Sequence, residues 1–322
     1  MPNTVNKSEA LENCITRTEV NGFPEPYRGK VRDVYDLDED TLGIVVSDRI
    51  SAFDHIMRQA IPFKGQILNQ LAAFGFKNVE DIVDTHIVDV PHPNVTIAKK
   101  CDPVPVEVVI RACLTGHAWR VYDSGKRELC GVPLPDGMMK NQKFEKPILT
   151  PATKAEEGHD QDISEKEILE RGIVDEKVWT EIREKAFRVF ERGQQVASER
   201  GLILVDTKYE FGLHNDNVTL IDEVHTADSS RYFYADEYEE RLRRGERQKQ
   251  LSKEFLREWL MEHGFQGLEE QTLPDLPDDF RWEVYERYEE LYEQLTGRTF
   301  EPTPVSDFNQ TLKSIFAGYK EG

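Results

Sequence analysis

The sequence has few cysteines, no long apolar run and a deficit of basic residues, and each shortage excludes a class of protein. Only four cysteines occur in 322 residues, and no two of them form a C-x-x-C pair. Scattered cysteines, in a chain whose first residues lack the apolar segment of an export signal, predict reduced thiols and a cytoplasmic protein. No run approaches the length of a transmembrane helix, so no membrane partner is expected.

Acidic residues outnumber basic ones by 61 to 41, which gives a net charge of −20. This charge argues against nonspecific nucleic-acid binding, because neutralising phosphates requires a basic surface. A small anionic substrate held by a few local arginines and lysines is still compatible with it. Hydrophobic residues make up 38% of the chain, enough at this length for one large domain or two modest ones.

The order of the patterns predicts a β-rich beginning and a more helical end. The short β-rich runs are 31–37, 42–47, 85–90 and 106–111. A helix is expected at 65–76, and a loop at 131–158, which is rich in proline and glycine. Ser164 to Glu167 form a capping box. A long amphipathic helix follows at 175–200, and the stripe of Leu312, Ile315, Phe316 and Tyr319 predicts a final helix that packs on the protein.

The most informative segment is a predicted β-hairpin at 202–221, with its turn at Asn215 and Asp216. Asp206, Lys208 and Glu210 alternate along its first strand and should share one face. The second apolar run ends at Asp222. Such charges are costly to bury unless a metal or an anionic substrate is present. The alternative is a solvated face of an exposed hairpin.

Two N-terminal segments combine charge with turn residues. Gly29, Lys30 and Arg32 could approach a polyphosphate, although a basic turn that begins a strand would look the same. Asp48, Arg49, Ser51 and Asp54 crowd the end of the next strand. These could equally be turn residues and a surface ion pair.

Two central segments add further candidates. Arg111 ends an apolar strand, and a turn containing His117 follows it, an arrangement that suits a phosphate monoester. His117 could also be an ordinary turn residue. The loop 149–164 carries Lys154 and Asp160 and could be simply solvated. The spacing of histidines and cysteines fits no zinc signature, so the oxygen-rich residues favour Mg²⁺.

Taken in order, these segments resemble the SAICAR synthase family of purine biosynthesis. The resemblance covers about residues 25–234 and rests on seven ordered blocks. They read YRGKVRDVYDL, SDRISAFDHIM, KGQILNQLAAF, PVEVVIRACLTGHAW, TPATKAEEGHDQDIS, VDTKYEFG and DEVHTADSSRYF. VDTKYEFG matches the family's D-x-K-x-E-F-G signature at every fixed position.

The resemblance implies an enzyme that uses Mg²⁺ and ATP to join the carboxylate of CAIR, a phosphorylated imidazole ribonucleotide, to the amine of L-aspartate. An acyl phosphate would be the intermediate. The implied catalytic residues are Asp206, Lys208 and Asp222. The implied ATP-binding residues are Gly29, Lys30, Arg32, Lys208, Glu210 and Asp222. The implied substrate-binding residues are Asp48, Arg49, Ser51, Asp54, Arg111, His117, Lys154, Ser229 and Arg231. The implied Mg²⁺ ligands are Asp160 and Asp222.

One position departs from the family pattern. The block around Arg111 usually ends in serine, and here His117 stands in its place. A neutral imidazole still has one donor and could keep a phosphate contact.

The resemblance also implies an α+β, two-lobed SAICAR-synthase-like fold with an ATP cleft between the lobes. The expected parts are a β-rich nucleotide-binding lobe at 1–111, an α/β catalytic lobe at 112–234, and an acidic helical extension at 235–322 packed on the catalytic lobe. A monomer is expected, with CAIR and L-aspartate as its small-molecule partners.

Two other functions compete with this reading. Asp206, Lys208 and Asp222 echo the order of catalytic groups in protein kinases, but Phe211 stands where a kinase would have asparagine, and no G-x-G-x-x-G loop occurs. An acidic nucleotide-binding scaffold would be expected to have lost the metal acids or phosphate-binding bases, which are all present.

Overall fold

The computed structural model describes residues 6–154 and 161–319, and these form two compact units. The first unit holds residues 6–74, 86–100 and 252–319. The second holds the described residues of 75–85 and 101–251. Both combine helices with mainly antiparallel sheets, which confirms the α+β class. Within the described ranges, no helix is long and apolar enough to cross a membrane.

The first unit is built on a five-stranded antiparallel sheet. Its strands, in spatial order, are β1 (Tyr27–Arg28), β2 (Arg32–Asp36), β3 (Thr41–Val46), β8 (Val95–Lys99) and β7 (Ile87–His92). A small hairpin joins β4 (Ser51–Ala52) to β5 (His55–Ile56). The helices of this unit are α1 (Lys7–Glu12), α7 (Glu254–Glu262), α8 (Asp278–Thr296) and α9 (Phe308–Ala317), and α2 (Lys64–Lys77) begins in it.

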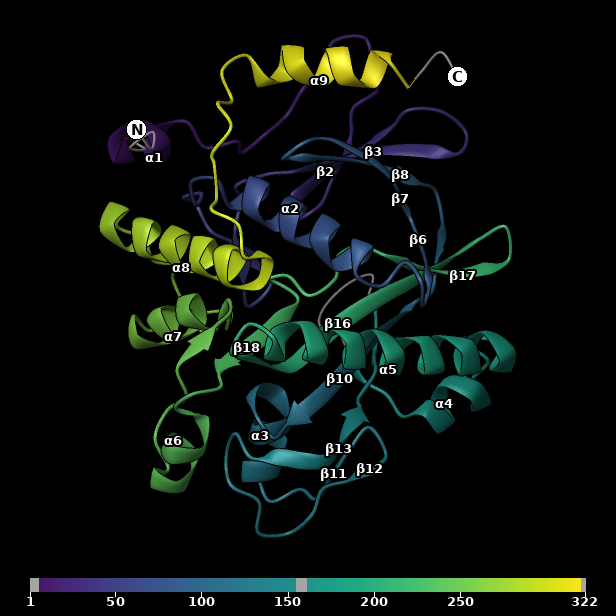
Figure 1. Ribbon diagram of the computed structural model, residues 1–322, viewed down its shortest axis with the longest axis vertical. Coiled ribbons are helices and arrows are strands. Elements are labelled where there is room, and N and C mark those ends of the chain that lie inside the picture. Colours follow the sequence, from purple (N-terminus) through teal and green to yellow (C-terminus); the bar gives the residue numbers. More distant parts are fainter. Residues whose placement is uncertain (1–5, 155–160, 320–322) are drawn as a thin grey trace. The chain divides into compact units, whose positions relative to one another are not determined.

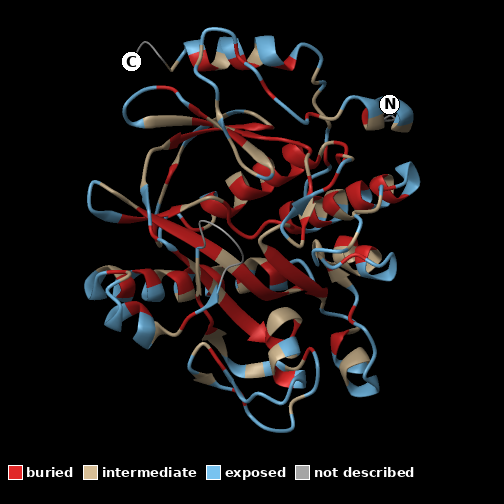
Figure 2. Cartoon of the chain, turned by 180° about the vertical axis from the view of Figure 1, so that it is seen from behind, coloured by how far each residue is buried: buried red, intermediate tan, exposed pale blue. Residues whose placement is uncertain are grey.

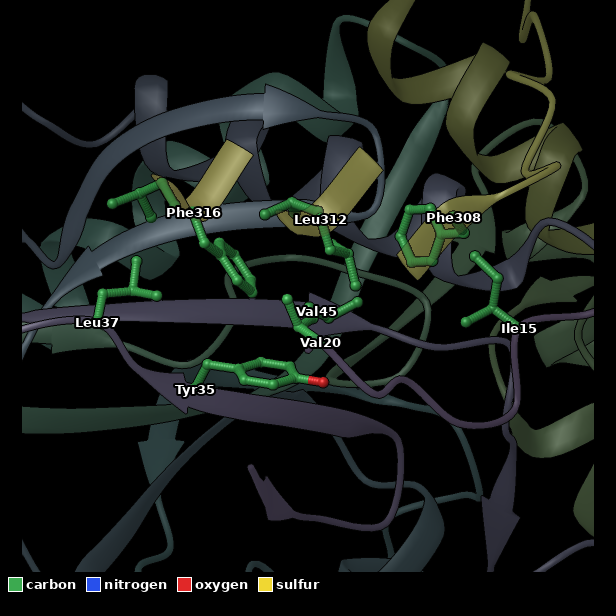
Figure 3. Close-up of a cluster of buried hydrophobic side chains, with 10 residues drawn as sticks. Ile15, Val20, Tyr35, Leu37, Val45, Phe308, Leu312 and Phe316 are labelled. Carbon is green, nitrogen blue, oxygen red and sulfur yellow. The ribbon is translucent and has the colours of Figure 1, made fainter. Parts of the chain in front are cut away.

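Helix α9 completes the core of the first unit. Phe308, Leu312 and Phe316 point from α9 toward Tyr35 of β2 and Val45 of β3 (Figure 3). The predicted stripe is therefore confirmed as a packing face. The grouping of the extension differs from the expected one, because residues 252–319 belong with the N-terminal sheet and not with the catalytic lobe. An amphipathic stripe indicates that a helix docks, but it does not specify the surface that receives it.

The second unit contains a ten-stranded sheet. Its main path is β15 (Gln161–Asp162), β14 (Ala152–Thr153), β10 (Val106–Cys113), β16 (Leu202–His214), β17 (Asn217–Ile221) and β6 (Asp84–Thr85). The strands attached beside this path are β9 (Asp102–Pro103), β13 (Lys143–Leu149), β18 (Ser230–Tyr234) and β19 (Gln250–Leu251). A separate hairpin pairs β11 (Glu128–Leu129) with β12 (Val132–Pro133). The helices are α3 (Gly116–Asp123), α4 (Glu165–Glu170), α5 (Glu176–Ser198) and α6 (Tyr238–Arg244).

Local sequence signals explain several of these elements. The capping box of Ser164 and Glu167 opens α4. Asp175 caps α5, whose apolar stripe packs against β16 and β10 (Figure 1). Asn215 and Asp216 adopt φ values of 50° and 63° in the turn between β16 and β17, which confirms the hairpin. Buried residues dominate the central strands of this sheet (Figure 2).

The predicted loop at 131–158 is wrong in part, because it contains β13, β14 and the strand β12. β13 gains its hydrogen bonds from β10, with Ile110 opposite Leu149 and Arg111 opposite Ile148. Proline and glycine weaken a local strand signal, but a neighbouring strand can still supply the missing pairing.

Candidate active site

The turn that contains Gly29 and Lys30 lies between β1 and β2 of the first unit. The Gly29 N–H donates to the Arg32 carbonyl at 2.8 Å and closes the turn. Arg49 fixes the turn by donating to the carbonyls of Gly29 and Lys30, each at 3.1 Å, and to the Asp33 carboxylate at 2.9 Å. Arg49 was expected to face a substrate, but its contacts in the structure support the turn.

Asp48 is buried, and its position in the structure does not resemble an open substrate site. Its two oxygens accept hydrogen bonds from the backbone N–H groups of Ile15, at 2.7 Å, and Gly65, at 2.9 Å. Burial raises the pKa of Asp48 to about 6, although these two N–H groups favour its charged form. Asp48 therefore ties the chain before β1 to the start of α2.

The hairpin β4–β5 carries the two other candidates of this segment. Ser51 begins β4 and is half-buried, and Asp54 lies at the tip of the hairpin and pairs with Lys30. Lys30 and Asp54 are about half exposed, so their ion pair contributes little stability. Arg32 is half-buried at the start of β2.

In the second unit, Lys208 of β16 lies among carboxylates. Its Nζ is 3.0 Å from Oε1 of Glu107 and 3.7 Å from Oδ2 of Asp222, and it also pairs with Glu210. Lys154 forms a second ion pair with Glu210. Burial acts to lower the pKa of Lys208, but the surrounding carboxylates outweigh it and hold that pKa well above its usual value.

A second charged cluster consists of Arg111, Asp206 and Arg231 on adjacent strands. Asp206 is the cross-strand neighbour of Arg111 on β10 and of Arg231 on β18. Its Oδ2 lies 3.2 Å from Nη1 of Arg111 and 3.7 Å from Nη1 of Arg231. Burial lowers the pKa of Arg111, and Asp206 opposes that effect. Two guanidinium groups facing one carboxylate leave the cluster with a net positive charge.

The positive cluster adjoins the N-terminus of α3. Nη1 of Arg231 donates to Oγ1 of Thr115, the N-cap residue, at 3.2 Å. Gly116 follows with a φ of 54°, and a Cβ atom there would lie 2.6 Å from the Arg231 guanidinium. The backbone conformation therefore favours glycine here, and a side chain would also displace the Arg231 guanidinium. A helix N-terminus beside buried arginines is a favourable place for an anion.

His117, the next residue, pairs with Asp162. Its Nε2 lies 2.8 Å from Oδ2 of Asp162, and both side chains are partly exposed. The hydrogen bond from His117 lowers the pKa of Asp162. The expected ligand of His117 was a substrate phosphate, whereas its contact in the structure is this carboxylate beside the α3 N-terminus.

The loop between β17 and β18 supplies the remaining described candidates. Asp222 begins it, and Oγ of Ser229 accepts a hydrogen bond from the Thr226 N–H at 3.2 Å. The Ser229 carbonyl accepts from the Lys208 N–H at 3.0 Å. Asp160 lies outside the described residues. Among the residues that are described, no group of three or more His, Cys, Asp or Glu side chains is placed to hold a metal ion.

The contacts agree with the expectation that Asp206, Lys208 and Glu210 share one face of β16. Their partners Arg111 and Glu107 are themselves four positions apart on β10, and so lie on one face of that strand. Sequence reasoning missed Glu107, Thr115 and Asp162. A strand register between β10 and β16 would have located Glu107, but register depends on the partner strand and cannot be read from either strand alone.

Comparison with known proteins adds an independent finding. The family model described as SAICAR synthetase matches residues 25–272. The phosphoribosylaminoimidazole-succinocarboxamide synthase of Cytophaga hutchinsonii is 52% identical over 93% of this chain and 97% of its own length.

Solved structures are similar in fold as well as in sequence. A SAICAR synthase from Saccharomyces cerevisiae, complexed with SAICAR, is 34% identical with a TM-score of 0.77, over 89% of this chain and all of that one. A SAICAR synthetase in complex with ADP is 26% identical with a TM-score of 0.65, over 86% of this chain and all of that one. This chain belongs to the SAICAR synthetase family.

Proposed function

We propose that this protein joins the carboxylate of CAIR to the amine of L-aspartate with ATP, and forms SAICAR, ADP and phosphate in purine biosynthesis. Membership of the family over most of the chain supports this function. The ligands of two relatives, SAICAR in one and ADP in the other, are both products of this reaction.

The observation that carries the proposal is the positive cluster of Arg111, Asp206 and Arg231 at the start of α3. Both arginines are only 9% exposed, so their charges are poorly screened by water. Guanidinium groups bind phosphate through paired N–H donors, and the free N–H groups of the first helical turn add to them. We assign the 5′-phosphate of CAIR to this positive cluster. Ser229 and His117 lie close in sequence to Arg231 and Arg111.

Lys208 is suited to the phosphoryl-transfer step. Its raised pKa keeps it protonated at neutral pH. An ammonium group held by Glu107 and Glu210 can neutralise negative charge that develops on a transferring phosphoryl group. Lys154, which also pairs with Glu210, would then respond to changes in the charge of this cluster.

In the first unit, we assign the ATP phosphates to the turn of Gly29 and Lys30, with Arg32 beside it. Arg49 holds both carbonyls of the turn and so fixes its shape before any ligand binds. A preformed turn reduces the entropy lost on binding.

Carboxylate oxygens are the protein ligands that Mg²⁺ prefers. Asp222 would hold it, together with Asp160. When bound, Mg²⁺ would neutralise charge on the nucleotide phosphates.

The chemistry proceeds in two steps. A carboxylate oxygen of CAIR attacks the terminal phosphorus of ATP, the bond from that phosphorus to the bridging oxygen breaks, and ADP leaves. The resulting acyl phosphate is a better electrophile than a carboxylate. The aspartate amine then attacks the acyl carbon, inorganic phosphate leaves, and the amine releases its proton to water. Lys208 supplies charge stabilisation, and the arginine cluster orients the nucleotide substrate.

The test measures ADP and SAICAR with ATP, Mg²⁺, CAIR and L-aspartate, and omits each component in turn. SAICAR should form only in the complete mixture. ADP production at the full rate from a hydroxyl acceptor without aspartate would instead identify a kinase.

Arg231→Lys tests whether the positive cluster binds CAIR. It should raise the KM for CAIR by roughly 10- to 100-fold and change that for ATP little, because one charge-assisted hydrogen bond contributes about 1.5–3 kcal/mol. Arg192→Lys is the matched control, since Arg192 forms a two-point pair with Asp81 in the same unit. A larger effect on the KM for ATP than on that for CAIR would mean that the two pockets are assigned the wrong way round.

The monomeric state and the cytoplasmic location remain predictions from the sequence.

A further inference from the structure

The loop from Asp222 to Ser229 is held in a strained backbone conformation. Asp222 has a φ of 67° and His225 a φ of 57°, in the left-handed region that residues with a side chain rarely adopt. Such a conformation is costly and persists only where its surroundings enforce it. The loop begins with Asp222, near Lys208, and leads directly into Arg231 on β18.

His225 ties the loop to two strands of the sheet, through Tyr209 of β16 and Tyr232 of β18. Its Nε2 and the Tyr209 hydroxyl are hydrogen-bonded at 2.6 Å, and its carbonyl accepts from the Tyr232 hydroxyl at 2.8 Å. Both tyrosines are almost fully buried. Burial also lowers the pKa of His225 to about 3, so the ring is neutral at physiological pH. These hydrogen bonds hold the ring and the backbone of one residue at the same time.

Two glycines make room for this arrangement. A Cβ atom at Gly193 of α5 would lie 2.3 Å from Cε1 of His225, so the ring sits directly against the helix backbone. A Cβ atom at Gly75, near the end of α2, would lie 2.4 Å from the Val224 carbonyl oxygen. Neither glycine has a positive φ, and both are needed here for close approach alone.

We propose that His225 is a positioning residue: its contacts with Tyr209, Tyr232 and Gly193 form a clamp that holds the 222–229 loop so that Asp222 and Arg231 meet the substrates. This inference rests on the proposed function. The clamp lies on the other side of β16 from the charged groups, because Tyr209 stands between Lys208 and Glu210 on an alternating strand. One strand thus presents charges to the site and a hydroxyl to the clamp.

His225 contacts no proposed ligand, but through the clamp it should affect turnover. Relaxing the strained loop would move Asp222 at its start and Arg231 just beyond its end. Small displacements of positioning groups can lower rates by up to about 100-fold. We therefore expect Tyr209→Phe to lower kcat by about 10- to 100-fold and to raise the KM for CAIR, while the protein stays folded.

Tyr238→Phe is the matched control for this substitution. Tyr238 is equally buried in the second unit, and its hydroxyl donates to the Asn141 carbonyl at 2.8 Å, away from the loop. Tyr238→Phe should lower Tm by an amount comparable to that of Tyr209→Phe, and its kcat should stay within twofold of the wild-type value. Equal kcat values for Tyr209→Phe and wild type, with a lowered Tm, would reduce the clamp to a purely structural feature and overturn the proposal.

A second pair of variants separates stability from positioning. Gly193→Ala should lower both Tm and kcat, because the new methyl group displaces the His225 ring. Adding His225→Gly removes the ring and relieves the positive φ, so Tm should recover while kcat stays low. Recovery of kcat together with Tm would show that the ring has no positioning role.

Hydrogen exchange distinguishes failure of the clamp from failure of the proposed function. If wild-type protein forms no SAICAR, the function is wrong, and the clamp is then judged on the free protein. Amides of residues 223–230 should exchange faster in Tyr209→Phe than in Tyr238→Phe. Identical exchange in the two variants would overturn the clamp whatever the activity.

Discussion

Arg111 and Arg231 share a single carboxylate, Asp206, and this sharing sets the charge of their surroundings. A one-to-one buried pair would be neutral, and its attraction for a substrate anion would be weak. Here the second guanidinium leaves positive charge that is directed at the first turn of α3. In the proposed function, this charge attracts the phosphate of CAIR.

The pairing of His117 with Asp162 gives a prediction at the same scale. The Asp162 carboxylate is paired with Nε2 of His117 and places negative charge near the start of α3. Asp162→Asn should lower the KM for CAIR by roughly 3- to 10-fold, since removing an exposed like charge contributes about 1 kcal/mol. Steady-state kinetics with CAIR as the varied substrate measures this change.

His117→Ser supplies the control for this prediction. If the imidazole freed by Asp162→Asn contacts the phosphate, the KM for CAIR should decrease less in the double variant of Asp162→Asn and His117→Ser than in Asp162→Asn alone. A KM for CAIR that rises in Asp162→Asn would indicate instead that Asp162 holds His117 in its binding position.

Helix α9 illustrates how one element completes a core built from distant parts of the chain. Phe316 is fully buried and packs against Tyr35, with ring centroids 5.1 Å apart. Phe23 also contacts the Phe316 ring, with ring centroids 5.6 Å apart. Since the sheet of the first unit contributes the opposing face, loss of this helix would expose apolar residues of β2 and β3.

We expect Phe316→Ala to lower the free energy of unfolding of the first unit by about 3–5 kcal/mol, because it leaves a cavity in a close-packed core. Urea denaturation followed by aromatic fluorescence would measure the loss. Lys313→Ala, at an exposed position of the same helix, should change the free energy by less than about 0.5 kcal/mol. Similar losses for both variants would mean that the burial of Phe316 does not account for the contribution of α9.

At the scale of the whole molecule, buried titratable groups make stability depend on pH. Burial, together with the nearby charges of Arg32 and Lys99, lowers the pKa of His86 to about 3 from an ordinary value of 6.5. The folded protein therefore resists protonation of His86 more than the unfolded chain does. The resulting stability is fully present above pH 6.5 and is lost as pH falls toward 3.

His86→Gln should remove this dependence. The fall in the pKa of His86 from 6.5 to about 3 corresponds to at most about 5 kcal/mol, so the wild-type curve of unfolding free energy should fall more steeply between pH 6.5 and 4 than that of the variant. Chemical denaturation at several pH values checks this, with pH 8 as the reference at which His86 is neutral. Parallel curves would show that His86 titrates alike in the folded and unfolded states.

The sequence by itself determined the elements whose signals are local. The capping box at Ser164, the stripe of α5 and the hairpin turn at Asn215 each follow from the conformational preferences of a few neighbouring residues. Alternation along 206–210 likewise indicated that three charged side chains share a face. The ordered blocks also predicted the family, because such motifs are themselves short stretches of sequence.

Only the tertiary structure decided which partners these groups meet. Glu107 reaches Lys208, and Asp162 reaches His117, through strand pairings whose register depends on residues far away in the chain. In the sequence, Arg49 and Asp48 looked like polar residues that face a substrate. In the structure they form hydrogen bonds with backbone groups of other segments. The physical reason is that burial and hydrogen bonding depend on segments distant in sequence, and a local pattern carries no information about what those segments bring.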